Sequence, residues 1–231
     1  MRRILAYLER LWATDIALTM LLIILLIYIF FLYPLGLIGS LRPVPSILFS
    51  LILITGAITV SRNRIFRTFV FSWGLLVFIL LWARYLLPFQ TLTFVVNCFG
   101  LFFLVLLTFL ILHQALREGP TTSHRIMGAV AAYLLIGMIW FLAYYLIALW
   151  IPGAFSIQEP SAPGGRESLQ SQLFYFSFVT LTTVGFGDIT PTHEISRMFV
   201  VMEALVGQLY PATLLARLVS LQLMNQDEDK G

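Results

Sequence analysis

The sequence predicts an all-α membrane protein with six transmembrane helices and a shorter, re-entrant helix and loop between the fifth and sixth of them. Of its 231 residues, 60% are hydrophobic and only 11% are charged, and the mean hydropathy is +0.94. A soluble domain carries about 25% charged residues, so this composition excludes that class. The apolar residues also fall in runs close to the roughly 20 residues that a helix needs to cross a bilayer.

Proline, glycine and polar clusters divide the chain into these elements. Two prolines within residues 42–45 end the first apolar run, Pro88 ends the third, and Gly119 and Pro120 separate the fourth from the fifth. Residues 152–168 are rich in Pro, Gly and Ser and predict an exposed loop. The next segment, Ser168–Leu181, is too short to span a membrane but suits a re-entrant helix. The six expected spans are Thr14–Leu37, Ser46–Val60, Thr68–Leu87, Leu92–His113, Arg125–Trp150 and Thr192–Leu223.

The positions of the basic residues predict the orientation of these spans. With the amino terminus in the cytoplasm, ten Lys and Arg residues lie inside and four outside, as the positive-inside rule requires. We therefore expect both termini to be cytoplasmic and the re-entrant segment to enter from outside. The inner set is Arg2, Arg3, Arg10, Arg62, Arg64, Arg67, Arg117, Arg125, Arg217 and Lys230, and the outer set is Arg42, Arg84, Arg166 and Arg197.

The re-entrant segment is followed by Thr183-Val-Gly-Phe-Gly187 and then by Asp188. Gly185 and Gly187 allow backbone conformations that are closed to residues with a Cβ atom, so successive carbonyl groups can point toward one axis. Rings of backbone carbonyls can replace the hydration shell of an ion in a narrow pore. This segment resembles the selectivity filter of the potassium channels, in which Tyr more often occupies the position of Phe186.

The resemblance implies a role for each residue of this segment. K⁺ would be coordinated at Thr183, Val184, Gly185 and Phe186, with the Thr183 hydroxyl closing the innermost site. The side chains of Val184 and Phe186 would face away from the axis, and Asp188 would belong to an acidic ring at the outer mouth. Further support for the filter would come from Thr180 and Thr182 at the end of the re-entrant helix.

The predicted architecture resembles the six-helix potassium channels, most closely over residues 127–220. We therefore expect passive, potassium-selective conduction, with permeant K⁺ and no cofactor or nucleic acid. One filter segment per chain cannot surround an ion, which predicts a homotetramer. The expected parts are a four-helix unit at 1–120, a pore domain at 121–224 and a short cytoplasmic tail at 225–231. The chain has no Asn-x-Ser/Thr sequence, which is compatible with a bacterial inner membrane.

The four-helix unit does not have the charge pattern of a voltage sensor. Leu92–Leu112 contains no Lys or Arg, whereas steep voltage dependence needs several charges in the field. The basic residues Arg62, Arg64 and Arg67 lie between the second and third spans. They suit ordinary topology anchoring, and the alternative is a site for anionic lipids.

The sixth span carries the residues predicted to control the pore. Gly207 matches the inner-helix glycine hinge of the potassium channels, and Pro211 should kink the helix. The alternative is that Gly207 only allows close helix packing. Glu203 is an ionisable group in an apolar stretch and therefore a functional candidate. It could face the back of the filter, near Ser177, Thr180 or Thr182, or face the central cavity. At the start of the span, Thr190 can cap the helix, Pro191 suits its first turn and Glu194 favours its positive end.

Two other classes of protein remain open alongside the channel. A modulatory subunit that does not itself conduct would keep this fold, and the intact filter segment argues against it. An ion-coupled transporter would normally show internal repeats and broken helices, and the sequence has one interruption, at the filter. An enzyme is not expected, because the sequence has no nucleotide-binding loop or catalytic constellation. The sequence does not indicate the stimulus that would open the channel.

Overall fold

The computed structural model describes residues 18–30, 44–59, 64–86, 90–115, 123–157 and 166–228. Within these ranges the chain is almost entirely helical, with one short two-stranded ribbon. In chain order the elements are the helix Leu18–Phe30, α2 (Val44–Thr59), α3 (Arg64–Leu86), α4 (Gln90–Ala115), α5 (Ser123–Trp150), β1 (Phe155–Ile157), α6 (Arg166–Leu181), β2 (Ile189–Pro191) and α7 (Glu194–Glu228).

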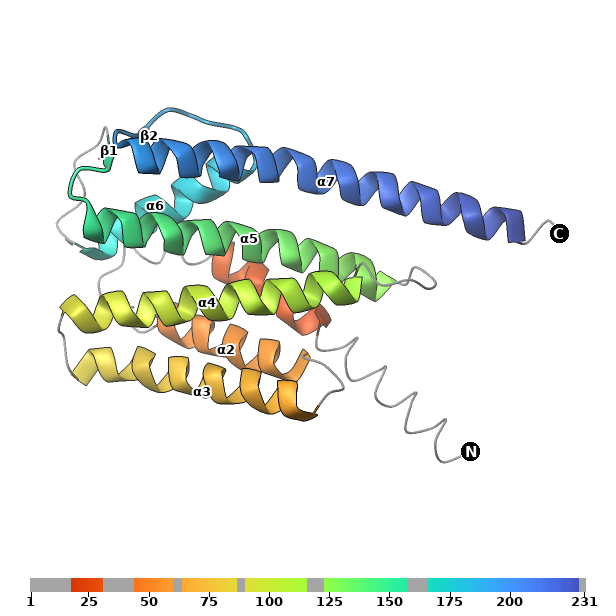
Figure 1. Ribbon diagram of the computed structural model, residues 1–231, viewed down its shortest axis with the longest axis horizontal. Helices are drawn as coiled ribbons and strands as arrows, with labels where there is room; N and C mark the ends of the chain where they lie inside the picture. Colours follow the sequence, from red (N-terminus) through yellow and green to blue (C-terminus); the bar gives the residue numbers. More distant parts are fainter. Residues whose placement is uncertain are drawn as a thin grey trace.

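Helix α5 lies at the centre of the arrangement (Figure 1). It packs against α4 on one side and against α6 and α7 on the other, and α2 and α3 pack beyond α4. The short helix α6 is inclined to its neighbours and brings the loop that follows it alongside α7 (Figure 1). The elements that flank the predicted filter therefore come together on one side of α5.

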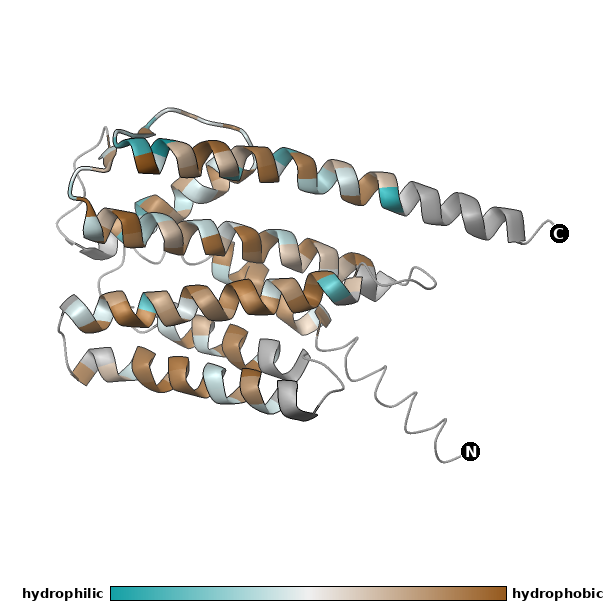
Figure 2. Ribbon diagram, in the orientation of Figure 1, coloured by the Kyte–Doolittle hydropathy of each residue, from teal (hydrophilic) through white to brown (hydrophobic). Residues whose placement is uncertain are grey.

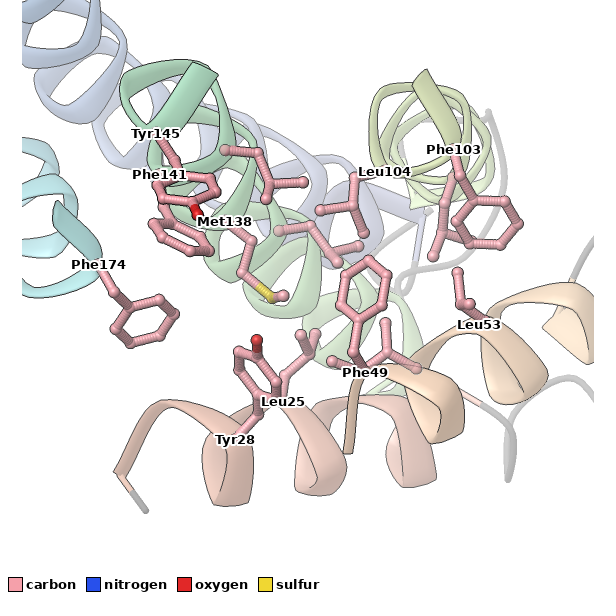
Figure 3. Packing of buried hydrophobic residues seen from close by; sticks show 14 of the residues in the cluster. Leu25, Tyr28, Phe49, Leu53, Phe103, Leu104, Met138, Phe141, Tyr145 and Phe174 are labelled. Carbon is pink, nitrogen blue, oxygen red and sulfur yellow. The ribbon is translucent and has the colours of Figure 1, made fainter. Parts of the chain in front are cut away.

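A single cluster of buried hydrophobic side chains connects these layers (Figure 3). It begins on the helix Leu18–Phe30 and α2, crosses the inner faces of α4 and α5, and reaches α6. Between helices in a membrane, such side chains stabilise the packing mainly through van der Waals contacts. Members of the cluster are Leu25, Tyr28, Phe49, Leu53, Phe103, Leu104, Met138, Phe141, Tyr145 and Phe174.

Three helices of the described part are long and apolar enough to cross a membrane, over Thr91–His113, Ile126–Trp150 and Glu194–Arg217. Figure 2 shows hydrophobic residues along most of α3, α4 and α5. The apolar helices Leu18–Phe30 and Thr68–Ala83 are shorter. The 16 residues of α2 extend about 24 Å at 1.5 Å per residue, which is less than a hydrocarbon core. The described residues thus form a largely helical membrane protein.

Helix α4 has no Lys or Arg, and its two buried polar side chains, Asn97 and Thr108, bond to its own backbone. The Asn97 amide donates to the Thr93 carbonyl at 2.6 Å, and the Thr108 hydroxyl donates to the Leu104 carbonyl at 2.7 Å. These groups satisfy their hydrogen bonding locally, so they require no polar partner on a neighbouring helix.

The predicted start of the last helix is wrong by a few residues. Thr190 and Pro191 belong to strand β2, and α7 begins at Glu194. The cap is His193, whose Nδ1 accepts a hydrogen bond from the Ile195 amide at 3.2 Å. The prediction failed because strand pairing holds Thr190 and Pro191 in an extended conformation, and the helix can begin only after it ends.

The predicted loop at 152–168 also contains a strand that the sequence did not reveal. Strands β1 and β2 pair in antiparallel fashion, with Phe155 opposite Pro191, Ser156 opposite Thr190 and Ile157 opposite Ile189. The ribbon joins the segment after α5 to the segment after the predicted filter. Both ends of the α6 region are therefore tied together.

Candidate functional site

Helix α6 fits against α5 at a position where α5 has no side chain. A Cβ atom at Gly137 would lie 2.7 Å from the ring of Phe178, closer than real contacts allow. The Ser177 hydroxyl oxygen lies 2.8 Å from the Gly137 carbonyl oxygen. The absence of a Cβ atom at Gly137 therefore lets the carboxyl-terminal half of α6 approach the α5 backbone closely.

The backbone after α6 alternates between two conformations. Thr183, Gly185 and Gly187 have positive φ angles of 58°, 57° and 79°, whereas Val184 and Phe186 between them do not. In an extended strand successive carbonyls point to opposite sides. When residues in the left-handed region alternate with residues outside it, successive peptide groups turn the same way. Their carbonyls can then point to the same side of the loop.

Hydrogen bonds to α6 determine the side of the loop to which these carbonyls point. The amides of Val184 and Gly185 both donate to the Val179 carbonyl, at 3.0 and 3.4 Å. A trans peptide points its carbonyl opposite to its amide hydrogen, and none of the described peptide bonds is cis. The carbonyls of Thr183 and Val184, which share these two peptide groups, consequently point away from α6.

The positive φ of Thr183 is a feature that sequence reasoning missed. A β-branched residue in this region is a clear outlier, and the conformation costs about 1–3 kcal/mol. The Thr183 amide donates to the Thr180 carbonyl at 2.9 Å, which anchors the residue to the end of α6. No local pattern could have indicated this conformation, because threonine normally disfavours it.

The side chains of the loop lie as follows. The Phe186 ring stacks on Tyr175 of α6, with 6.5 Å between centroids and 3° between planes, while Val184 is half-exposed. The Thr182 hydroxyl donates to the Phe178 carbonyl at 2.7 Å, and Thr180 is buried. Asp188 is partly exposed and directly precedes β2. Phe186 is therefore directed back toward α6, opposite to the Thr183 and Val184 carbonyls.

The far end of the loop is anchored by the segment after α5. The Ala154 carbonyl accepts hydrogen bonds from the Thr192 amide at 3.0 Å and from the buried Ser196 hydroxyl at 2.8 Å. The Thr192 hydroxyl donates to the Gly153 carbonyl. Residues 182–188 are thus held at one end by α6 and at the other by the ribbon and the start of α7.

This anchoring yields a testable prediction about the ribbon. We expect Ser156→Cys combined with Thr190→Cys, in a Cys98→Ser background, to form an intrachain disulfide in most molecules under mild oxidation. The two residues are directly opposite, so their Cβ atoms are close to the separation a disulfide needs. Maleimide labelling with and without reductant measures the yield. The control pair, Ser156→Cys with Thr192→Cys, is displaced along the strand and should cross-link poorly. Equal yields from both pairs would contradict the register.

Gly207 packs against the end of α6. A Cβ atom there would lie 1.9 Å from the Leu181 carbonyl oxygen and 2.8 Å from the carbonyl carbon. The Tyr133 hydroxyl of α5 donates to the same carbonyl oxygen at 3.2 Å. Helix α7 continues without interruption through Pro211, which is exposed. The geometry thus favours close packing, one of the two interpretations of Gly207 that the sequence left open.

Glu203, one turn before Gly207, is fully buried and faces the back of the loop region rather than open space. Its carboxyl oxygens lie 2.6 Å from the Ser177 hydroxyl of α6 and in contact with the Tyr144 hydroxyl of α5. The hydroxyls of Thr180 and Thr182 are not among its described partners. Tyr144 and Tyr133 were missed by sequence reasoning, since a tyrosine in an apolar span does not reveal which helix its hydroxyl will meet.

The structure does not describe the basic side chains of the predicted anionic-lipid site. Arg62 lies outside the described residues, and the side chains of Arg64 and Arg67 at the start of α3 are not described. The predicted anionic-lipid site therefore stays a prediction. Among the described residues, no group of three or more His, Cys, Asp or Glu side chains could hold a metal ion.

Comparison with known proteins bears on this region of the chain. Residues 132–222, which run from α5 to α7, match a family described as "Ion channel". The chain is 40% identical over 65 residues to Protein LctB from Geobacillus stearothermophilus, an alignment covering 28% of this chain and 48% of that protein. It is 38% identical over 56 residues to the human voltage-gated delayed rectifier potassium channel KCNH5, covering 24% of this chain and 6% of that one.

The chain thus matches about half the length of LctB and a small part of KCNH5. No solved structure matches it. The matched residues include the loop at 182–188, the whole of α6 before it, and most of α5 and α7. These matches and the apolar helices indicate a membrane protein whose carboxyl-terminal part is similar to an ion-channel family.

Proposed function

We propose that the chain is a subunit of a passive, potassium-selective channel, with the filter at Thr183, Val184, Gly185, Phe186 and Gly187. The observation that carries this proposal is the direction of the Thr183 and Val184 carbonyls away from α6, in a loop whose alternate residues have positive φ. Carbonyls that share one side of a narrow loop are the ligands that a dehydrated K⁺ requires.

Four chains would surround the ion, because one loop supplies only one wall of a pore. Two features support this assembly. The loop residues 182–187 are exposed in the single chain, and α7 carries an exposed apolar stripe with the 3–4 spacing of a packing helix. The stripe consists of Ile195, Met198, Met202, Leu205 and Leu209. In the tetramer this face would pack against neighbouring subunits, and Asp188 would contribute to an acidic ring at the outer mouth.

The proposal also includes the membrane topology and the location that the sequence predicts. Six helices would span the membrane, α6 would be the re-entrant pore helix, and both termini would be cytoplasmic. The membrane would be a bacterial inner membrane, as expected from the sequence. Lipids would surround the outer helices, and α4 would not act as a voltage sensor because it has no Lys or Arg.

The test is ion flux through the purified protein in liposomes. We expect K⁺ flux well above Na⁺ flux, blocked by Ba²⁺, a divalent ion close to K⁺ in size. Equal K⁺ and Na⁺ flux would contradict selectivity at this filter. Absence of flux from wild-type protein and from a folded Pro211→Ala variant, in which the expected kink of α7 is removed, would favour a modulatory subunit.

A further inference from the structure

Three helices meet at a cluster of polar groups behind the loop. Glu203 of α7 contacts the Tyr144 hydroxyl of α5 through Oε2 and the Ser177 hydroxyl of α6 through Oε1, the latter at 2.6 Å. The Ser177 oxygen lies 2.8 Å from the Gly137 carbonyl oxygen of α5. Glu203, Tyr144 and Ser177 are all buried. This cluster connects α5, α6 and α7 at a level just before the loop.

The surroundings of the carboxyl group disfavour a charge. Its described partners are two neutral hydroxyl groups, and Glu203 is 0% exposed. The other titratable side chain that α5 brings near is Tyr133, whose hydroxyl donates to the Leu181 carbonyl. A buried carboxylate needs a paired cation to offset the loss of hydration. Among the described residues, the partners of Glu203 supply hydrogen bonds and no such cation.

The protons in the cluster can be counted. There are three contacts between oxygen atoms: Tyr144 with Glu203, Ser177 with Glu203, and Ser177 with Gly137. Each hydroxyl has one proton to donate, and the carbonyl has none. With an ionised carboxylate, two protons serve three contacts, and one pair of oxygens meets with no proton between them. With a protonated Glu203, every contact contains one proton.

We propose that Glu203 is a neutral carboxylic acid that donates its proton to Ser177 and thereby fastens α7 to the helix that carries the filter. In this arrangement Ser177 donates to the Gly137 carbonyl and Tyr144 donates to Glu203 Oε2. Glu203 is a positioning residue, acting on the loop through α6. It adds no negative charge behind the filter, so cation attraction is left to the loop carbonyls and Asp188.

The protonation state is tested directly by infrared spectroscopy of the purified protein at pH 7. We expect a carboxylic-acid C=O band that disappears in Glu203→Gln and shifts in D₂O. The band should move to higher frequency in Tyr144→Phe, where the carbonyl oxygen loses its donor. Absence of any carboxylic-acid band that depends on Glu203 would overturn the proposal. This measurement does not require conduction, so it is independent of whether the channel function itself is correct.

The positioning role is tested by flux, and this arm rests on the proposed channel function. Glutamine keeps one donor and one acceptor, so Glu203→Gln should retain K⁺ flux and K⁺/Na⁺ discrimination within about twofold. Glu203→Met matches the side chain in size without its hydrogen bonds, and should lower K⁺ flux by about tenfold. Equal loss in both variants, or full activity of Glu203→Met, would overturn the positioning role. Thermal unfolding of each variant shows whether the protein is still folded.

Discussion

Gly185→Ala is expected to abolish potassium-selective flux while leaving the protein folded and assembled. Gly185 has a φ of +57°, and a Cβ atom there would find no other atom within 4 Å. The substitution is therefore unfavourable only because of its backbone conformation, which costs an L-residue about 1–2 kcal/mol in each subunit. We expect rotation of the adjoining peptide groups to relieve this conformational strain in the variant. The same rotation turns the Val184 carbonyl away from the conduction path.

The chain provides a matched control for this prediction. Gly153 also has a positive φ, +79°, and a Cβ atom there would also lie in open space. Gly153→Ala therefore has a similar conformational cost in the turn after α5, outside the filter. We expect it to keep K⁺ flux and K⁺/Na⁺ discrimination in liposomes close to wild type, with both variants eluting as tetramers. Loss of selectivity in both variants, or in neither, would contradict a specific role for the backbone at Gly185.

The helices could be predicted from the sequence because their signal is local. The long apolar runs in α4, α5 and α7 mark helices that can cross a membrane, and the length of α6 distinguishes it from them. In the amino-terminal half, α3 contains residues 68–86 of the expected span Thr68–Leu87, and α4 contains the whole of Leu92–His113.

The parts that could not be predicted depend on contacts between distant segments. Strands β1 and β2 have three residues each and pair across the whole α6 region, so neither shows a long enough alternating pattern. Their pairing also displaced the predicted cap of α7 from Thr190 to His193. The left-handed conformation of Thr183 contradicts the local preference of threonine. It is maintained by hydrogen bonds to α6, which no propensity scale includes.

Gly207→Ala is expected to destabilise the protein strongly rather than to change only its gating. The added Cβ atom would lie 1.9 Å from the Leu181 carbonyl oxygen, which is a backbone atom at the end of α6. Relief requires α7 to move away from α6, and this movement would break the contact between Glu203 and Ser177 one turn earlier. Overpacking of this kind costs about 1–3 kcal/mol or more, so we expect a thermal midpoint lower by several degrees and poor assembly.

A graded series of glycines tests whether contact geometry determines this effect. At Gly100 a Cβ atom would meet the Phe49 ring at an ordinary 3.6 Å, whereas at Gly137 it would meet the Phe178 ring at 2.7 Å. A ring can rotate away and a backbone carbonyl cannot, so stability should fall in the order Gly100→Ala, Gly137→Ala, Gly207→Ala. All three positions are buried within helices, so alanine improves helix propensity at each of them. A hinge at Gly207 predicts the opposite result: wild-type stability in Gly207→Ala, with only the open probability reduced. Thermal unfolding and single-channel recording of the same preparation therefore separate a packing glycine from a hinge.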